Sequence, residues 1–273
     1  MSLQREEVLS GERFDFGHNW STFLKLLNNE RINEAETSLK TMLGVDDLTG
    51  KSFLDVGSGS GLFSLAARRL GANVVSFDYD PKSVACAHEL KRRYFPEDSN
   101  WVIQEGSALD FDFISGLGQF DVVYSWGVLH HTGDMWRGLD NLVPLVASRG
   151  TIFIAIYNDQ QFVSRIWLWV KKIYNLGAFG RCLMKIVFYP WFAIQTIAAG
   201  LIREQNPIAR FTNYKKERGM SIIHDWKDWL GGYPFEVARP EELLNFFRDR
   251  GFELIRMVTT NRLGCNELVF FRK

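Results

Sequence analysis

The sequence predicts an α/β fold in which a doubly wound, mostly parallel sheet carries helices on both faces. Three observations support it: short apolar runs between residues 51 and 157, helical stretches that separate these runs, and a glycine-rich turn directly after the first run. Strands that alternate with helices form parallel sheets through right-handed crossovers. The apolar runs are Ser52–Val56, Asn73–Phe77, Trp101–Gln104, Asp121–Ser125 and Thr151–Tyr157.

Apolar spacing divides the chain into four parts. We expect an N-terminal helical cap over residues 1–50, a core over 51–157, a helical insertion over 158–235, and a C-terminal helix with closing strands over 236–273. The core helices are predicted at Gly61–Leu70, Pro81–Tyr94 and Asp134–Val146. The last helix is predicted to begin at Pro240, and the closing strands form a hairpin, with ranges Phe252–Val258 and Glu267–Phe271.

Composition narrows the class of protein. The 273 residues suffice for one large domain, or for one domain with an insertion. Lys and Arg (32) balance Asp and Glu (32), so overall charge gives no argument for a nucleic-acid partner. The three cysteines lie far apart, without metal or disulfide spacing, which fits a reduced cytoplasmic protein. The N-terminus is polar, and we expect no secretory signal there.

The turn Gly57-Ser58-Gly59-Ser60-Gly61 is the most informative stretch, because glycine lets a ligand approach the main chain. A phosphate-binding loop would need a lysine after the turn, but Leu62 follows. A dinucleotide fold would also place a third glycine at Leu62. Asp55 stands where such a strand is apolar, and a buried carboxylate needs a partner, such as a cationic ligand or the amides of the turn. An ordinary strand-to-helix turn stays open as an alternative.

A second signal follows the next predicted strand. Asp78 ends that strand, where an acidic side chain can accept both ribose hydroxyls of an adenosine group. Tyr79 follows and could pack on the adenine ring. Asp80 precedes Pro81 and is expected to cap the next helix.

Four motifs in this order resemble those of class I S-adenosylmethionine (SAM)-dependent methyltransferases. Leu54–Gly61 resembles their first motif, and Val75–Asp80 their acidic ribose motif. Glu105–Asp110 resembles the segment that contacts adenine, which implies roles for Ser107, where the family often has Asp, and for the Ala108 backbone. Phe120–Ser125 resembles the fourth strand, whose end meets the methionine part of SAM. The resemblance implies a Rossmann-like seven-stranded sheet with an antiparallel C-terminal hairpin. It implies the cofactor-binding residues Asp55, Gly57, Ser58, Gly59, Gly61, Asp78, Tyr79, Ser107, Ala108, Ser125 and Trp126.

Four further segments resemble the ubiquinone-pathway O-methyltransferases, the polyprenyl-hydroxyphenyl methylases. They are Asp15–Trp20, Ala155–Asp159, Gly231–Glu236 and Gly264–Glu267. The resemblance implies methyl transfer to a hydroxyl of a small acceptor. Removal of the hydroxyl proton is helped by a base.

The adjacent His130 and His131 are the candidate catalytic base, because histidine exchanges protons near neutral pH. They follow the fourth strand, at the sheet edge where ligands bind. The alternative is that one of them caps a helix or bonds to the backbone, and of the two, His131 is the more expected in this structural role. Asp134 is close in sequence, but adjacent histidines point in different directions, so we expect no metal.

The insertion is predicted to be a helical lid over the acceptor. We expect one apolar face of its first helix to be buried, and the opposite arc, which includes Ser164 and Lys171, to be polar. The apolar face comprises Phe162, Ile166, Trp169, Val170 and Ile173. Residues 158–220 hold ten Lys or Arg and three Asp or Glu, so a second interpretation is peripheral membrane contact through 162–202. Pro190 and polar residues interrupt the uncharged stretch Ile186–Ile202, so we expect no membrane span.

The acceptor is predicted to be apolar or aromatic, and a membrane contact would suit a lipophilic one. The aromatic residues that indicate this are Tyr189, Trp191, Phe192, Trp226, Trp229, Tyr233 and Phe235. Phe16, His18 and Trp20 are expected to close the cofactor site from the other side. Two other functions stay open: a SAM-fold binding protein without catalysis, and an NAD-dependent oxidoreductase.

Overall fold

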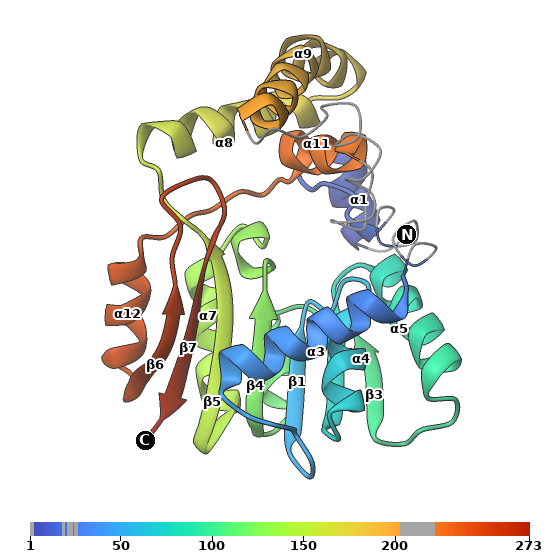
Figure 1. Ribbon diagram of the computed structural model, residues 1–273, viewed down its shortest axis with the longest axis vertical. Coiled ribbons are helices and arrows are strands. Elements are labelled where there is room, and N and C mark those ends of the chain that lie inside the picture. The colour runs from blue at the N-terminus through green and yellow to red at the C-terminus, as the bar shows by residue number, and fades with distance from the viewer. Residues whose placement is uncertain (1–2, 18–19, 21–23, 25–26, 203–221) are drawn as a thin grey trace.

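The computed structural model describes residues 3–17, 20, 24, 27–202 and 222–273. These residues form one seven-stranded sheet in the order β3-β2-β1-β4-β5-β7-β6 (Figure 1). The strands are β1 Ser52–Val56, β2 Asn73–Asp78, β3 Trp101–Glu105, β4 Phe120–Trp126, β5 Val146–Tyr157, β6 Phe252–Val258 and β7 Cys265–Arg272. Strands β1 to β5 are parallel, and β7 lies antiparallel between β5 and β6. The predicted fold class is confirmed.

Helices cover both faces because successive strand residues point to opposite sides of the sheet. Phe53 packs in the core beneath α3, α4 and α5, and its neighbour Leu54 packs in the core beneath α6, α7 and α12. The helices are α1 Leu3–Ser10, α3 Asn29–Leu43, α4 Leu62–Arg69, α5 Pro81–Tyr94, α6 Phe111–Ser115, α7 Met135–Leu142, α8 Phe162–Asn175, α9 Ala178–Ile202, α11 Ile222–Gly231 and α12 Pro240–Arg248. Short 3₁₀ helices are η1 Leu129–His131 and η2 Val143–Leu145.

The strand order reverses between β1 and β4, and this reversal positions the site. The chain builds β1, β2 and β3 outward in one direction and then returns to place β4 on the other side of β1. In open parallel sheets, ligands bind beyond the carboxyl ends of the strands at such a reversal. The glycine turn follows β1, and both candidate histidines follow β4.

Local signals explain where the helices beside the site begin and end. The Asp80 carboxylate accepts the Lys82 amide at 2.9 Å, with Pro81 in the first turn of α5, as predicted. The predicted helix Asp134–Val146 is shorter in the structure. It ends at Leu142, because Pro144 has no amide to continue the helix, and β5 begins at Val146.

The helices α8, α9 and α11 lie beyond the carboxyl ends of the parallel strands, at one end of the molecule (Figure 1). The predicted buried face of α8 was wrong, because Phe162 is 68% exposed and Trp169 is 64% exposed. Of the predicted face only Val170 is buried, and the buried side of α8 also carries Trp167 and Tyr174. Packing against Phe14, Leu230 and Phe235 selects this side. Within the described residues, no helix combines the length and apolarity of a membrane span.

Lys171 belongs to the buried side of α8, although the sequence places it on the polar arc. It is fully buried, and its Nζ donates to the Trp229 carbonyl at 2.6 Å. The ammonium also lies 5.0 Å from the centre of the Phe235 ring. A buried cation needs such partners. The predicted role of His18, and the insertion residues 203–221, lie outside the described residues.

Candidate active site

The glycine turn leaves β1 in a conformation that only glycine adopts readily. A Cβ on Gly57 would lie 2.3 Å from Val128 Cγ1, so the close approach of these segments also excludes a side chain. The positive φ angles are 73° at Gly57, 55° at Gly59 and 80° at Gly61. The Ser58 Oγ is buried and has no hydrogen-bond partner among the described residues. The end of β1 therefore offers a ligand the main chain of the glycine turn and the Ser58 hydroxyl.

Asp78 joins the glycine turn to the end of β2. Its Oδ2 accepts the Gly59 amide at 2.8 Å, and its Oδ1 accepts the Asp80 amide at 2.8 Å. Each carboxylate oxygen keeps capacity for a further donor. Burial raises the pKa of Asp78 to about 6, although both amides and the nearby Arg13 lower it. The two strongest sequence signals therefore meet at one point.

Asp55 lies beneath the turn and is 2% exposed. The Ser64 hydroxyl of α4 donates to its Oδ2 at 2.5 Å. Burial raises the pKa of Asp55 to about 7, and the Ser64 hydrogen bond lowers it. The partner that this buried carboxyl group was predicted to need is thus the Ser64 hydroxyl. This hydrogen bond ties α4 to β1.

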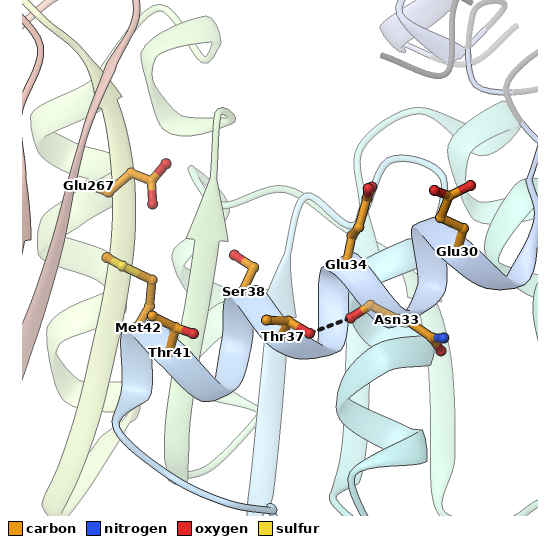
Figure 2. A pocket seen from close by; sticks show the side chains of 8 residues that line it. All are labelled: Glu30, Asn33, Glu34, Thr37, Ser38, Thr41, Met42 and Glu267. Carbon is orange, nitrogen blue, oxygen red and sulfur yellow. Dashed lines mark hydrogen bonds between the residues drawn. The ribbon is translucent and has the colours of Figure 1, made fainter. Parts of the chain in front are cut away.

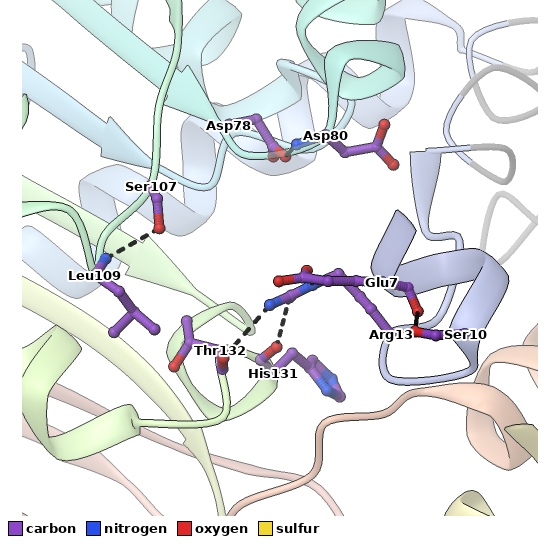
Figure 3. Close-up of polar contacts among 9 residues, drawn as sticks. All are labelled: Glu7, Ser10, Arg13, Asp78, Asp80, Ser107, Leu109, His131 and Thr132. Atoms are coloured by element: carbon purple, nitrogen blue, oxygen red, sulfur yellow. Dashed lines mark hydrogen bonds and ion pairs between the residues drawn. The ribbon is translucent and has the colours of Figure 1, made fainter. Parts of the chain in front are cut away.

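The segment after β3 lies beside Asp78, as the motif order predicts. The Gly106 amide donates to the Asp78 carbonyl at 3.0 Å. The Ser107 hydroxyl accepts the Leu109 amide at 3.1 Å, so it shapes its own turn (Figure 3). Ala108 is buried, and its carbonyl accepts the Asn141 side-chain amide at 2.9 Å.

Ser125 and Trp126 at the end of β4 have different environments. Ser125 is fully buried, and its hydroxyl donates to the Val56 carbonyl at 3.3 Å. Trp126 is 44% exposed, and its side chain hydrogen-bonds the Glu267 carboxylate. Only Trp126 therefore offers surface to a bound molecule.

The two candidate histidines have opposite tautomers. The Tyr157 amide donates to His130 Nδ1 at 3.2 Å, so neutral His130 carries its proton on Nε2. His131 Nδ1 lies 2.6 Å from the Pro234 carbonyl and must donate to it, so the lone pair of neutral His131 is on Nε2. Burial lowers the pKa of His131 to about 3 and that of His130 well below its usual value. Both rings are neutral at physiological pH.

Aromatic rings surround the histidines. The Tyr157 ring centre lies 3.9 Å from that of His130, and the Phe16 ring centre lies 4.9 Å from that of His131. Phe235 packs on Tyr157 at 5.4 Å. Other aromatic residues of the insertion pack on one another, such as Phe192 on Trp226 at 5.6 Å.

Arg13 is a site residue that sequence reasoning missed. Its Nη1 donates to the His131 carbonyl at 2.9 Å, and its Nε pairs with Glu7 at 2.7 Å. The guanidinium carbon lies 4.9 Å from the centre of the Tyr79 ring. Arg13 and Glu7 thus lie between the His131 turn and Asp78 (Figure 3). No local pattern marks Arg13, since His131 is 118 positions away.

Glu236 ends the segment Gly231–Glu236, and the sequence alone indicates no role for its side chain. Its carboxylate accepts the Gly133 amide at 3.0 Å and the Met135 amide at 3.1 Å. Its own amide donates to the His130 carbonyl at 2.9 Å. Pro234, whose carbonyl binds His131, and Glu236 belong to one segment. This segment therefore holds both His131 and the turn after β4.

Two grooves lie near these residues. One, of about 800 Å³, runs along α3 and is mainly polar, with Glu30, Glu34 and Glu267 among its lining residues (Figure 2). The other, of about 330 Å³, lies where β5 leads into α8 and includes Leu168 and Phe235. Only the second shares a residue with the aromatic group around the histidines. Among the described residues, no cluster of three metal-ligating side chains occurs.

Comparison with known proteins agrees with this geometry. Residues 54–152 match the family model described as a methyltransferase domain. Together, the match, the sheet order and the glycine turn show that the region 54–152 is similar to methyltransferase domains. Over this region the chain resembles ubiquinone biosynthesis O-methyltransferases. It is 32% identical over 120 residues to that of Pseudomonas aeruginosa, covering 41% of this chain and 46% of the relative. It is 31% identical over 113 residues to that of Escherichia coli, covering 41% and 45%. The match thus spans less than half the length of these curated relatives.

Solved structures share the fold over most of the chain. A magnesium protoporphyrin IX methyltransferase from Synechocystis PCC 6803, crystallised with bound S-adenosylhomocysteine (SAH), superposes with a TM-score of 0.54 at 13% identity, covering 89% of this chain and 83% of that one. A SAM-dependent methyltransferase from Aquifex aeolicus gives 0.51 at 14% identity, covering 95% and 99%. At these identities the likeness shows the fold alone.

Proposed function

We propose that this protein is a SAM-dependent methyltransferase that methylates a hydroxyl of a small apolar or aromatic acceptor. The observation that carries the proposal is the hydrogen bond from the Gly59 amide to the Asp78 carboxylate. It joins a bare glycine turn to an acidic strand end, the two features that a nucleoside with an amino-acid tail requires. The names of the curated relatives support oxygen as the methylated atom.

The residues at the reversal of strand order fit SAM. The free lone pairs of Asp78 would accept the ribose hydroxyls, and the main chain of Gly57–Gly61 would meet the amino-acid tail. The buried, unpartnered Ser58 hydroxyl is a donor for that tail. Tyr79 and the Ala108 backbone would border the adenine, and Trp126 the methyl group.

Bound SAM would supply a methyl group on a positively charged sulfur, which leaves as a neutral thioether. In the proposed transfer, the oxygen of the acceptor would take this methyl group. Residues of this chain mainly align these atoms, which removes much of the entropic barrier. The acceptor hydroxyl must also lose its proton.

We propose His131 Nε2 as the proton acceptor. The bond from Nδ1 to the Pro234 carbonyl leaves the Nε2 lone pair available, whereas His130 uses its lone pair on the Tyr157 amide. The low pKa of His131 keeps the ring neutral but makes it a weak base. Proton transfer therefore accompanies methyl transfer instead of preceding it.

The acceptor is proposed to bind between the inserted helices and the sheet, at the groove that includes Phe235. Its volume of about 330 Å³ suits a small molecule, and its Leu168 and Phe235 suit an apolar one. The inserted helices would then cover the acceptor as a lid. A lipophilic acceptor would reach this groove through peripheral membrane contact of residues 162–202.

Transfer of a labelled methyl group tests the proposal. The protein is incubated with SAM carrying a tritiated methyl group and a panel of hydrophobic phenols, with matched anilines and thiophenols. Label in a phenol, and none after Asp78→Ala, is expected. SAM binding without transfer to any acceptor class would favour a binding protein. Binding of NAD in place of SAM in a calorimetric titration would favour an oxidoreductase.

A further inference from the structure

Large apolar side chains project from the outer sides of α8 and α9. We define this outer face by Phe162, Ile166 and Trp169 on α8 and Phe179, Ile186 and Ile194 on α9. Phe179 is 80% exposed, and Ile186 and Ile194 are 68% and 65% exposed. Residues three or four apart on a helix share a side. The α8 residues have this spacing, and on α9 the exposed Leu183, Val187 and Trp191 fill the intervals, so each helix presents an apolar stripe. Contiguous exposed apolar surface of this kind marks a contact with a partner or a membrane.

The inner sides of the same helices already have their partners. Trp167, Val170 and Tyr174 of α8 and Met184 of α9 are buried in one cluster with Phe14 and other residues. The outer face is therefore not needed to hold the inserted helices together. The two helices lie together at the end of the molecule beyond the sheet (Figure 1).

Charge favours an anionic surface. Residues 160–202 contain no Asp or Glu. Of their cations, only Lys171 is buried, and the others are Arg165, Lys172, Arg181 and Lys185. The Lys172 ammonium lies 5.4 Å from the centre of the Trp169 ring, so an interfacial tryptophan and a cation share one place. An anionic lipid surface attracts basic residues, and within 160–202 no carboxylate opposes this attraction.

We infer that the outer face docks the protein on an anionic phospholipid bilayer. The apolar side chains would enter the headgroup region, and the four cations would meet lipid phosphates. As a route for a lipophilic acceptor, this docking rests on the proposed function. The lipid contact itself needs no turnover.

Vesicle sedimentation with the full chain tests the docking. We compare vesicles of phosphatidylcholine with vesicles that also contain phosphatidylglycerol, and expect binding mainly to the latter, weakened by salt. Phe162→Ser, Trp169→Ser and Phe179→Ser together should reduce binding at least tenfold, about 1.4 kcal/mol. The matched control replaces exposed apolar residues elsewhere: Leu9→Ser, Phe111→Ser and Ile255→Ser. Trp169→Ala alone, expected to weaken binding several-fold, serves if the triple variant does not fold.

A charge series separates lipid from other partners. Arg165→Gln, Lys172→Gln, Arg181→Gln and Lys185→Gln should each weaken binding to anionic vesicles about fivefold. The control series is Lys40→Gln, Lys51→Gln, Arg256→Gln and Lys273→Gln. Equal binding to both vesicle types, equal effects of both series, or a wild-type dimer that the outer-face variants convert to monomer would overturn the docking. SAH affinity is measured in parallel. Docking without SAH binding would refute the proposed function and leave the docking intact.

Discussion

At the scale of the residue, Asp78 carries the most weight, and its protonation state should control cofactor affinity. Ribose hydroxyls donate to the carboxylate form. Because the pKa of Asp78 is raised to about 6, SAH affinity should fall as pH drops through that value. We expect about tenfold weaker binding at pH 5 than at pH 7 by isothermal titration calorimetry.

Two variants check this assignment. Asp78→Ala should abolish measurable binding, and Asp78→Asn should bind weakly with no dependence on pH. Unchanged affinity in Asp78→Ala would remove Asp78 from the ribose role.

Asp55 should make the unliganded protein less stable as pH rises. Its folded pKa, about 7, lies above the unfolded value of about 4. The protonated form is thus favoured by folding, and this stabilisation is complete below pH 4 and lost as pH rises through 7. We expect Asp55→Asn, which can still accept from Ser64, to flatten the fall in melting temperature between pH 5 and pH 8.

The control for Asp55 is Asp121→Asn. The pKa of Asp121 is lowered, so this carboxyl is ionised throughout the same range. Its variant should keep the wild-type slope. An identical slope in Asp55→Asn would show that Asp55 is ionised in the folded protein.

His131 should matter for turnover and not for cofactor binding. His131→Gln can keep the bond to the Pro234 carbonyl but loses the Nε2 lone pair. Turnover should fall about a hundredfold or more, with SAH affinity unchanged. His88→Ala, at an exposed histidine of α5, should leave both unchanged. A large loss in His130→Ala beside an active His131→Gln would reverse the assignment.

The sequence identified the glycine turn, Asp78 and the histidine pair, because each stands at a strand end that apolar runs mark. On sequence alone, His131 is the more expected of the two histidines to have a structural role, and the proposal reverses that order. Their tautomers depend on Tyr157 and Pro234, which are distant in sequence. The role of Arg13 could not be predicted for the same reason, because its partner His131 is distant in sequence.

At the scale of the element, the glycine turn should tolerate no side chain at its first position. Gly57→Ala adds left-handed strain of about 1–2 kcal/mol and a clash with Val128. Gly118→Ala places a Cβ at φ 81° with nothing within 4 Å, so it carries the strain alone. Urea unfolding should show a larger loss of stability for Gly57→Ala, and only that variant should lose SAH binding. Equal losses of stability in Gly57→Ala and Gly118→Ala would mean that Val128 moves aside without a cost in free energy.

Helices and strands could be predicted where the spacing of their apolar residues alone decides which side is buried. All seven strands and the helix Pro81–Tyr94 follow from apolar runs and a capping signal. The buried side of α8 could not be predicted in this way. Large apolar side chains occur on more than one side of α8, so contacts with Phe14 and Leu230, and not its own pattern, decide which side faces inward.

At the scale of the whole molecule, the N-terminal segment Arg13–Gly17 connects two distant parts. The Phe14 amide donates to the Tyr233 carbonyl at 2.8 Å, beside the inserted helices. The Gly17 amide donates to Asp80 at 2.9 Å, beside the ribose-binding position. Lys82 pairs with Asp15 at 2.7 Å in the same place.

Loosening this segment should speed cofactor exchange. Arg13→Ala removes the bonds to the His131 turn and the contact with Tyr79, so SAH should dissociate several times faster in stopped-flow displacement. Arg248→Ala serves as the control, because the side-chain partner of Arg248 among the described residues is the adjacent Asp249. An unchanged dissociation rate in Arg13→Ala would show that the segment does not limit release.

Because the segment Arg13–Gly17 is fastened at both of its ends, the binding of one ligand should depend on the binding of the other. If the nucleoside binds at Asp78 as proposed, Arg13–Gly17 lies beside its path, so we expect the nucleoside to enter before this segment is fastened and the product to leave only after it is released. Steady-state kinetics should then follow a compulsory order, nucleoside first and last, even though the two ligands occupy separate compartments.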